Sequence, residues 1–132
     1  MSLELQGVSQ VVDGQLHIAP TDLVLEKGTM NVLLGPTSSG KTSLMRLMAG
    51  LDKPSTGRIL SSGTDVTNQW VQLRNVAMVY QEFINYPGMT VFDNIASPLR
   101  LKGQPKADID RTVRTTAEML KLTSILQRRP LE

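Results

Sequence analysis

Residues 35–42 read Gly-Pro-Thr-Ser-Ser-Gly-Lys-Thr and match the pattern G-x-x-x-x-G-K-[ST]. This spacing is typical of a loop whose backbone N–H groups surround the phosphates of a nucleotide. Gly35 and Gly40 allow backbone angles that a side chain would forbid, so consecutive amides can point at one anion. The sequence therefore predicts a phosphate-binding loop. The alternative is a glycine-rich turn that binds nothing.

The last residues of the loop add further chemistry. We expect Lys41 to reach the β- and γ-phosphates as a point charge, and Thr42 to offer its hydroxyl to Mg²⁺. A helix that starts here would direct about half a positive charge at the phosphates. The predicted ligands are therefore ATP and Mg²⁺. The expected nucleotide-binding residues of the loop are Gly35, Pro36, Thr37, Ser38, Ser39, Gly40, Lys41, Thr42 and Ser43.

The segments on either side of the loop suit this role. Residues 30–34 are mostly apolar and predict a short buried parallel strand. After the loop, apolar residues recur at helical spacing and Gly50 is a good C-terminal cap, so a helix is expected between them. A strand, a glycine-rich loop and a helix are the context that the motif requires. The apolar residues of the expected helix are Leu44, Leu47, Met48 and Leu51.

Short strands and helices are expected elsewhere. Ahead of the loop, three short apolar runs separated by turn signals predict an antiparallel sheet. The runs are 3–8, 16–18 and 23–25, and the turns are 13–14 and 27–28. Further strands are expected at 58–60 and, buried, at 76–80. A short helix at 91–96, closed by Pro98, and a longer helix at 109–120 complete the pattern.

Composition restricts the class of protein. The 132 residues suffice for one domain, and no apolar stretch approaches the roughly 18 residues of a membrane span. The N-terminus has no signal-peptide pattern, and the absence of cysteine excludes disulfides and thiolate metal sites. The net charge is only +2 and the basic residues are spread along the chain, so we expect no nucleic-acid binding.

Together these segments resemble the start of an ABC-transporter ATPase subunit, most similar to the importer branch for sugars and polyols. The anchors are 33–42, 48–51, 54–57, 74–81, 86–91 and 94–95, which cover nearly the whole chain. The resemblance implies an α/β fold, in which residues 1–132 form part of a P-loop NTPase-like nucleotide-binding domain with an N-terminal antiparallel β-subdomain. It also implies the coupling of ATP binding and hydrolysis to transport.

By the same resemblance, Gln81 is the Q-loop glutamine that senses Mg²⁺ or the attacking water. Its neutral amide can both donate and accept hydrogen bonds. The alternative is a polar residue that ends a strand. Glu82 is an alternative Walker B carboxylate, but Gln81 occupies the end of the expected strand, so we expect no such role for Glu82.

An apolar cluster follows Gln81. The resemblance implies that Phe83, Tyr86 and Met89 contact the coupling helix of a membrane permease, with Ile84 and Pro87 beside them. The alternative places these side chains in the local core. Partner permease subunits, a second ATPase subunit and a cytoplasmic location on the inner face of the plasma membrane are implied in the same way.

The chain departs from the family's pattern in two respects. An aromatic residue usually stacks on adenine, and counting back from the loop places Val12 there, so looser selectivity for adenine is expected. The chain also ends at Glu132, about where the signature sequence should begin, and no Walker B aspartate, catalytic glutamate or switch histidine is found. We therefore expect residues 1–132 to be truncated before both motifs and not to hydrolyse ATP alone.

Two other functions remain open. The chain could be a non-hydrolytic module that holds nucleotide or binds a permease, or it could be a small-molecule kinase built on the same loop. Sequence does not select the cargo, and it does not say whether the ATPase pair is a homodimer or a heterodimer.

Overall fold

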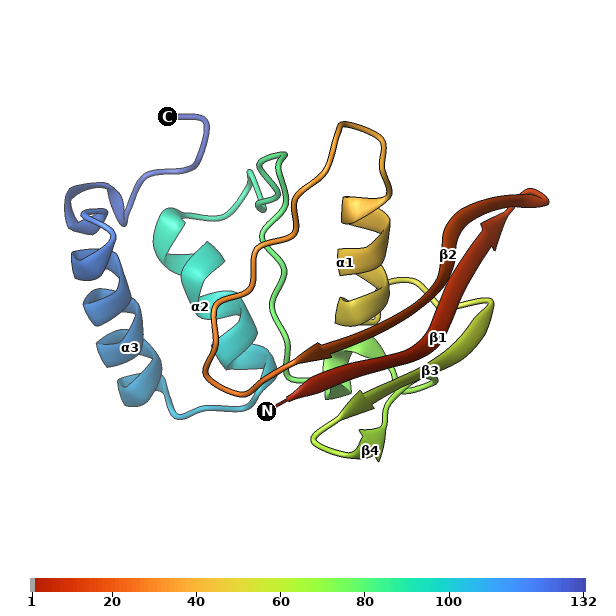
Figure 1. Cartoon of the computed structure of the whole chain (residues 1–132). Coiled ribbons are helices and arrows are strands. Elements are labelled where there is room, and N and C mark those ends of the chain that lie inside the picture. The colour runs from red at the N-terminus through yellow and green to blue at the C-terminus, as the bar shows by residue number, and fades with distance from the viewer. Residues whose placement is uncertain (1) are drawn as a thin grey trace. The chain divides into compact units, whose positions relative to one another are not determined.

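The computed structural model of the chain describes residues 2–132 and divides into two compact units (Figure 1). The first unit ends at Val79, and the second runs from Tyr80 to Glu132. The first contains β1 (Leu3–Val12), β2 (Gln15–Leu25), α1 (Lys41–Ala49), β3 (Thr56–Ser61), β4 (Thr64–Asp65) and a 3₁₀ turn (Val71–Leu73). The second contains α2 (Val91–Leu101), α3 (Lys106–Met119) and a 3₁₀ turn (Thr123–Ile125).

The first unit is built on an antiparallel sheet with the strand order β2-β1-β3-β4, which confirms the predicted antiparallel subdomain. The turn between β1 and β2 is formed by Asp13 and Gly14, with φ of 50° and 75°, as a tight hairpin with a right-handed twist requires. The two runs expected at 16–18 and 23–25 are one strand. Pro20 is tolerated there because β2 is an edge strand of the sheet.

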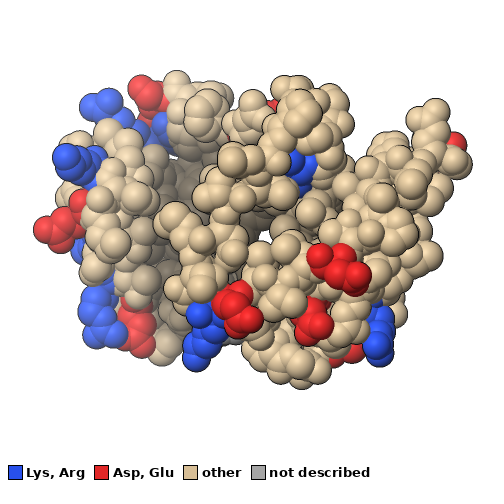
Figure 2. Space-filling model, in the orientation of Figure 1, with Lys and Arg blue, Asp and Glu red and all other residues tan. Residues whose placement is uncertain are grey.

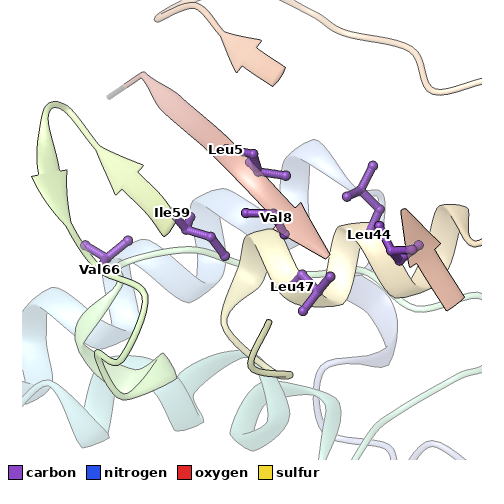
Figure 3. Packing of buried hydrophobic residues seen from close by; sticks show 7 residues of the cluster. Leu5, Val8, Leu44, Leu47, Ile59 and Val66 are labelled. Carbon is purple, nitrogen blue, oxygen red and sulfur yellow. The ribbon is translucent and has the colours of Figure 1, made fainter. Parts of the chain in front are cut away.

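One face of this sheet packs against α1. Leu5 and Val8 of β1 and Ile59 of β3 point toward Leu44 and Leu47 of the helix (Figure 3). The helix ends as predicted, because Gly50 adopts φ 80° and its N–H bonds to carbonyls of the last turn. The other buried members of this core are Ile18 and Val66. The packing fixes the direction of α1, and therefore the place of the loop before it.

The buried strands predicted at 30–34, as a parallel strand, and at 76–80 are not formed, and this part of the prediction is wrong. Both segments lack regular structure, and neither pairs with another strand among the described residues. Met30 is 93% and Val79 is 91% exposed. An apolar run supplies a strand's side chains, but a strand also needs a neighbour for its main-chain N–H and C=O groups.

The second unit is a pair of helices. The longer helix expected at 109–120 is confirmed, since α3 spans Lys106–Met119. The two helices share a core in which Ala96 of α2 and Val113 and Ala117 of α3 are completely buried. The start of α2 is bonded to the end of the chain, where the N–H of Val91 donates to the carbonyl of Arg128.

The prediction that Pro98 closes the first of these helices is wrong, because α2 continues through it to Leu101. A proline inside a helix leaves the carbonyl four residues earlier without its donor. Here that carbonyl belongs to Asn94, and the hydroxyl of Ser97 donates to it at 3.0 Å. The side chain next to the proline therefore replaces the missing hydrogen bond.

The surface is mixed in charge. On the face shown in Figure 2, Lys and Arg side chains are interspersed with Asp and Glu side chains. None of the helices among residues 2–132 has the length and apolar character needed to cross a membrane.

Candidate nucleotide-binding site

The predicted phosphate-binding loop lies directly before α1, as the motif requires. The ammonium group of Lys41 turns back over the loop. It donates to the carbonyl oxygen of Gly35 at 2.8 Å, to that of Pro36, and to the hydroxyl oxygen of Ser39 at 3.3 Å. The loop also closes on itself, because the N–H of Ser39 donates to the carbonyl of Pro36 at 3.3 Å. The structure therefore holds the lysine's charge at the centre of the loop.

The first turn of α1 provides the amide donors. Its N-cap residue is Gly40, with φ 86°, and no side chain caps the helix start. No acidic residue lies in the first turn. A helix start without a capping side chain or a carboxylate presents free N–H groups and a partial positive charge, which is the environment that an anion prefers. The arrangement suits a phosphate.

Backbone angle restricts only the second glycine of the motif, because Gly40 has φ 86°, whereas the restriction at Gly35 is one of space. A Cβ on Gly35 would lie 2.8 Å from the hydroxyl oxygen of Ser39. A Cβ on Gly40 would lie 2.6 Å from Cδ1 of Ile18 in β2. The loop is thus held against the sheet on one side and against its own serine on the other.

Thr42 is the candidate metal ligand of the loop. It lies in the first turn of α1 and is exposed, and its hydroxyl makes no hydrogen bond within the described part of the chain. In residues 2–132 no group of three His, Asp or Glu side chains forms a metal cluster. A hydroxyl beside a phosphate cradle fits Mg²⁺, which binds through few protein ligands together with phosphate oxygens.

Val12 lies at the end of β1 next to the hairpin turn and is 37% exposed. Two residues earlier, Gln10 pairs with Ile18, the residue that packs against Gly40. The hairpin that carries Val12 is therefore the one in contact with the phosphate loop. Contact with adenine stays a prediction.

Gln81 and Glu82 lie at the start of the second unit, in an exposed segment without regular structure. The loop that would hold phosphate belongs to the first unit. A joint metal site of Thr42 and Gln81 therefore stays a prediction.

The apolar cluster of the second unit is on the surface. Phe83 is 99%, Tyr86 is 58% and Met89 is 40% exposed, so the alternative that buries the cluster in a local core does not hold for Phe83. Ile84 is also exposed, at 70%. These side chains are available to a partner.

Sequence reasoning missed Asn94 as the residue that shapes this surface. Its amide oxygen accepts from the N–H of Tyr86 at 2.7 Å, and its amide nitrogen donates to the carbonyls of Tyr86 and Thr90 at 3.0 and 2.9 Å. It also donates to the carbonyl of Met89 at 3.3 Å. Asparagine can satisfy main-chain donors and acceptors together, and that versatility was the available signal.

Arg74 was also missed. It is only 6% exposed and donates to four main-chain carbonyls at the end of α1 and after β4. Burial lowers the pKa of its guanidinium. An arginine beside an apolar run is usually exposed, so no pattern in the sequence indicated its burial.

Comparison with known proteins places the chain in a family. The family described as ABC transporter matches residues 18–132. The chain is 40% identical to the sulfate/thiosulfate import ATP-binding protein CysA of Thermosynechococcus vestitus, over 98% of this chain and 39% of that protein. It is 42% identical to the trehalose/maltose import ATP-binding protein MalK of Thermococcus litoralis, over 98% of this chain and 37% of that protein.

A third relative is the sn-glycerol-3-phosphate import ATP-binding protein UgpC of Psychromonas ingrahamii, which is 41% identical over 91% of this chain and 32% of that protein. The chain thus spans about two fifths or less of the length of these relatives. Their names share import and ATP binding, but they differ in cargo. The phosphate loop, the helix behind it and these similarities lead to one conclusion: the chain belongs to the ABC-transporter family, among the ATP-binding proteins of importers.

Proposed function

We propose that this chain binds Mg-ATP as part of the ATPase subunit of an ABC importer. The observation that carries the proposal is the position of Lys41, whose ammonium group lies over a loop followed by a helix start without carboxylate or capping side chain. A fixed cation and free amides are the two donors that a triphosphate tail needs. The same arrangement gives a neutral ligand no comparable advantage.

Within this site the roles divide among few residues. The amides of the loop and the first turn would bind the phosphates, and Thr42 would bind Mg²⁺. The metal would neutralise charge on the phosphate oxygens. We propose that Gln81 completes the metal site or orients water, and that Val12 offers an apolar contact to adenine.

The exposed apolar cluster is the proposed contact with a permease. Large apolar side chains that are gathered on one surface are typical of protein interfaces. Phe83, Tyr86 and Met89 meet this description, and Asn94 fixes the main chain from which two of them project. Attachment to a permease would place the chain at the inner face of the plasma membrane, with a second ATPase subunit beside it.

For cargo we propose a sugar or a polyol. The names of two relatives, for trehalose/maltose and for sn-glycerol-3-phosphate, support this, whereas a third relative is named for sulfate and thiosulfate. Reconstitution of an ATPase subunit that contains this chain, together with its permease and binding protein, would test it. Sugar-stimulated ATP turnover is expected, and turnover that responds to sulfate alone would contradict it.

Calorimetry tests the central proposal. Titration of the purified chain with Mg-ATP should release or absorb heat with one site per chain, and titration with Mg-AMP should give much weaker binding because the β- and γ-phosphates are missing. Absence of any heat with Mg-ATP would overturn the proposal. Equal affinity for AMP would show that the loop is not the site.

A further inference from the structure

We propose that Arg74 is a positioning residue for the phosphate-binding loop, because its buried guanidinium holds the far end of α1, the helix whose first turn supplies the amide donors. Arg74 follows the 3₁₀ turn at Val71–Leu73 and reaches back over the chain to that helix. Its contacts are with main-chain atoms of two segments.

The guanidinium joins these two segments. Nη1 donates to the carbonyls of Leu47 and Met48, each at 3.3 Å, in the last turn of α1. Nη2 donates to the carbonyls of Val66 and Thr67, at 2.6 and 3.1 Å, in the segment after β4. The last carbonyls of a helix have no donor within it and carry partial negative charge, so a cation is favoured there. Arg74 thus ties the end of α1 to the sheet's last connection.

Filling space does not explain why a charged residue is buried at this position. All four hydrogen-bond acceptors of the guanidinium among the described residues are main-chain carbonyls, and none of them is a carboxylate. Its Nε is buried without a hydrogen-bond partner in the part of the chain that the structure describes. Burying a charge costs free energy that an apolar side chain of similar size would not cost. A guanidinium carries several N–H donors in one plane, and the hydrogen bonds that they make to the four carbonyls offset that cost.

There is no free space at this contact. A Cβ on Gly50, the C-cap of α1, would lie 2.4 Å from Nε of Arg74. The guanidinium therefore lies directly against the cap of the helix. Because α1 has nine residues, its two ends are roughly 13 Å apart along a stiff rod. If the end of α1 that Arg74 holds is free to move, the helix moves as a unit, and Gly40 and the amides that follow it move with it.

The first test needs no nucleotide. Hydrogen exchange is measured for the amide of Leu44, which donates to the carbonyl of Gly40 at 2.8 Å. The variants are Arg74→Met and Arg74→Lys. The matched control is Arg58→Met, which removes an exposed arginine in β3, and Ile59→Val provides a variant with lowered core stability.

Arg74→Met should accelerate exchange at Leu44 by roughly tenfold more than at amides of β1, since α1 loosens locally. Arg74→Lys keeps the positive charge but loses the planar set of N–H donors, so its exchange rate at Leu44 should lie between those of Arg74→Met and the wild type. Ile59→Val should change both regions by the same factor. If Arg74→Met does not fold, the exchange at Leu44 in Arg74→Lys, compared with that in β1, tests the inference.

The second test rests on the proposed function. Mg-ATP should bind Arg74→Met roughly tenfold more weakly than the wild type, because the donors lose their fixed geometry, and the two controls should stay within about twofold. If the wild type binds no Mg-ATP, the proposed function fails, and the exchange at Leu44 still decides the role of Arg74.

Two results would overturn the inference. The first is accelerated exchange confined to Gly50 and Leu51 in both Arg74 variants. The second is wild-type exchange at Leu44 combined with wild-type affinity for Mg-ATP. Either would show that the guanidinium stabilises only its own surroundings.

Discussion

Nζ of Lys41 donates a hydrogen bond of 2.8 Å to the carbonyl oxygen of Gly35, six residues earlier in the same loop. The loop therefore carries a lysine whose charge is held by its own main chain. When a phosphate binds here, the ammonium group of Lys41 exchanges its contacts with carbonyl oxygens for contacts with an anion. An anion is a stronger partner for an ammonium group than a neutral carbonyl.

The first prediction concerns this lysine. Lys41→Ala should weaken the binding of Mg-ATP by at least about a hundredfold, because a charge-assisted contact with the phosphates is lost. Calorimetry measures the change. The control is Lys53→Ala, which removes an exposed lysine shortly after α1 and should leave affinity unchanged. Equal affinity of wild type and Lys41→Ala would refute the assignment of the loop.

The second prediction concerns selectivity for the base. The wild type should bind Mg-ATP and Mg-GTP with similar affinity, since an aliphatic Val12 offers no ring for stacking. Val12→Tyr should strengthen the binding of Mg-ATP, because stacking a base on an aromatic ring contributes about 1–3 kcal/mol. The control is Val11→Tyr, at the adjacent exposed position. A strong ATP preference of the wild type would contradict this expectation.

The third prediction separates backbone strain from crowding at the cap of α1. Gly50→Ala and Gly63→Ala both place a side chain at a φ near 80°. Open space surrounds Gly63, whereas Arg74 lies within 2.4 Å of the new Cβ at Gly50. A residue held in a strained backbone conformation costs about 1–3 kcal/mol, so Gly63→Ala should lower the free energy of unfolding by about that much. Gly50→Ala should lower it clearly more, because the new side chain also meets Arg74. Urea unfolding followed by fluorescence of Trp70 measures both, and equal losses would mean that Arg74 moves aside freely.

The fourth prediction concerns the surface that carries Tyr86. Asn94→Ala should raise the hydrogen exchange of the Tyr86 amide, which now donates to the side chain of Asn94 at 2.7 Å. The loss of a partly buried bonding partner should cost about 1–3 kcal/mol in this unit. Asn94→Asp keeps the acceptor and should protect the amide better than alanine does. The control is Asn31→Ala, which removes an exposed amide that donates to the hydroxyl of Thr29, two residues earlier.

The fifth prediction concerns pH. Asp52 accepts two hydrogen bonds from Arg46, at 2.8 and 2.7 Å, and these lower the pKa of the carboxyl below its ordinary value of about 4. A folded-state pKa below the unfolded one gives stability that is present above pH 4 and is lost as the pH falls through the folded pKa. Asp52→Asn should therefore show a weaker loss of stability between pH 4 and pH 2 than the wild type.

Urea midpoints at pH 7, 4 and 2.5 provide the measurement. The pair is partly exposed, so the difference should be small and should shrink in high salt. Parallel curves for both proteins across this range would show that the ion pair does not contribute to stability.

The sequence predicted those elements whose partners are close along the chain. The β1–β2 hairpin needs only the turn at Asp13-Gly14, and α1 needs only its apolar stripe and the cap at Gly50. The phosphate loop belongs to the same class, since its donors come from consecutive residues and from Lys41. Local spacing carries this information directly.

The failures have a different physical origin. The segments 30–34 and 76–80 have the composition of strands, yet strand formation depends on a neighbour that composition does not supply. At Pro98 the outcome depended on one hydroxyl, that of Ser97, which replaces a missing main-chain donor. The burial of Arg74 depends on four carbonyls, two of which lie 27 and 26 residues away in sequence, in Leu47 and Met48. A neighbouring strand or a carbonyl distant in sequence becomes visible only once the chain has folded.

The exposed apolar side chains at 30–34, and Val79 in the segment 76–80, have a consequence in a living cell. Each segment has at least one exposed large aliphatic side chain, and neither pairs with a strand among the described residues. Chaperones and proteases recognise the same combination in nascent polypeptides. The amount of this protein that survives quality control should therefore depend on how quickly something covers those two stretches after synthesis.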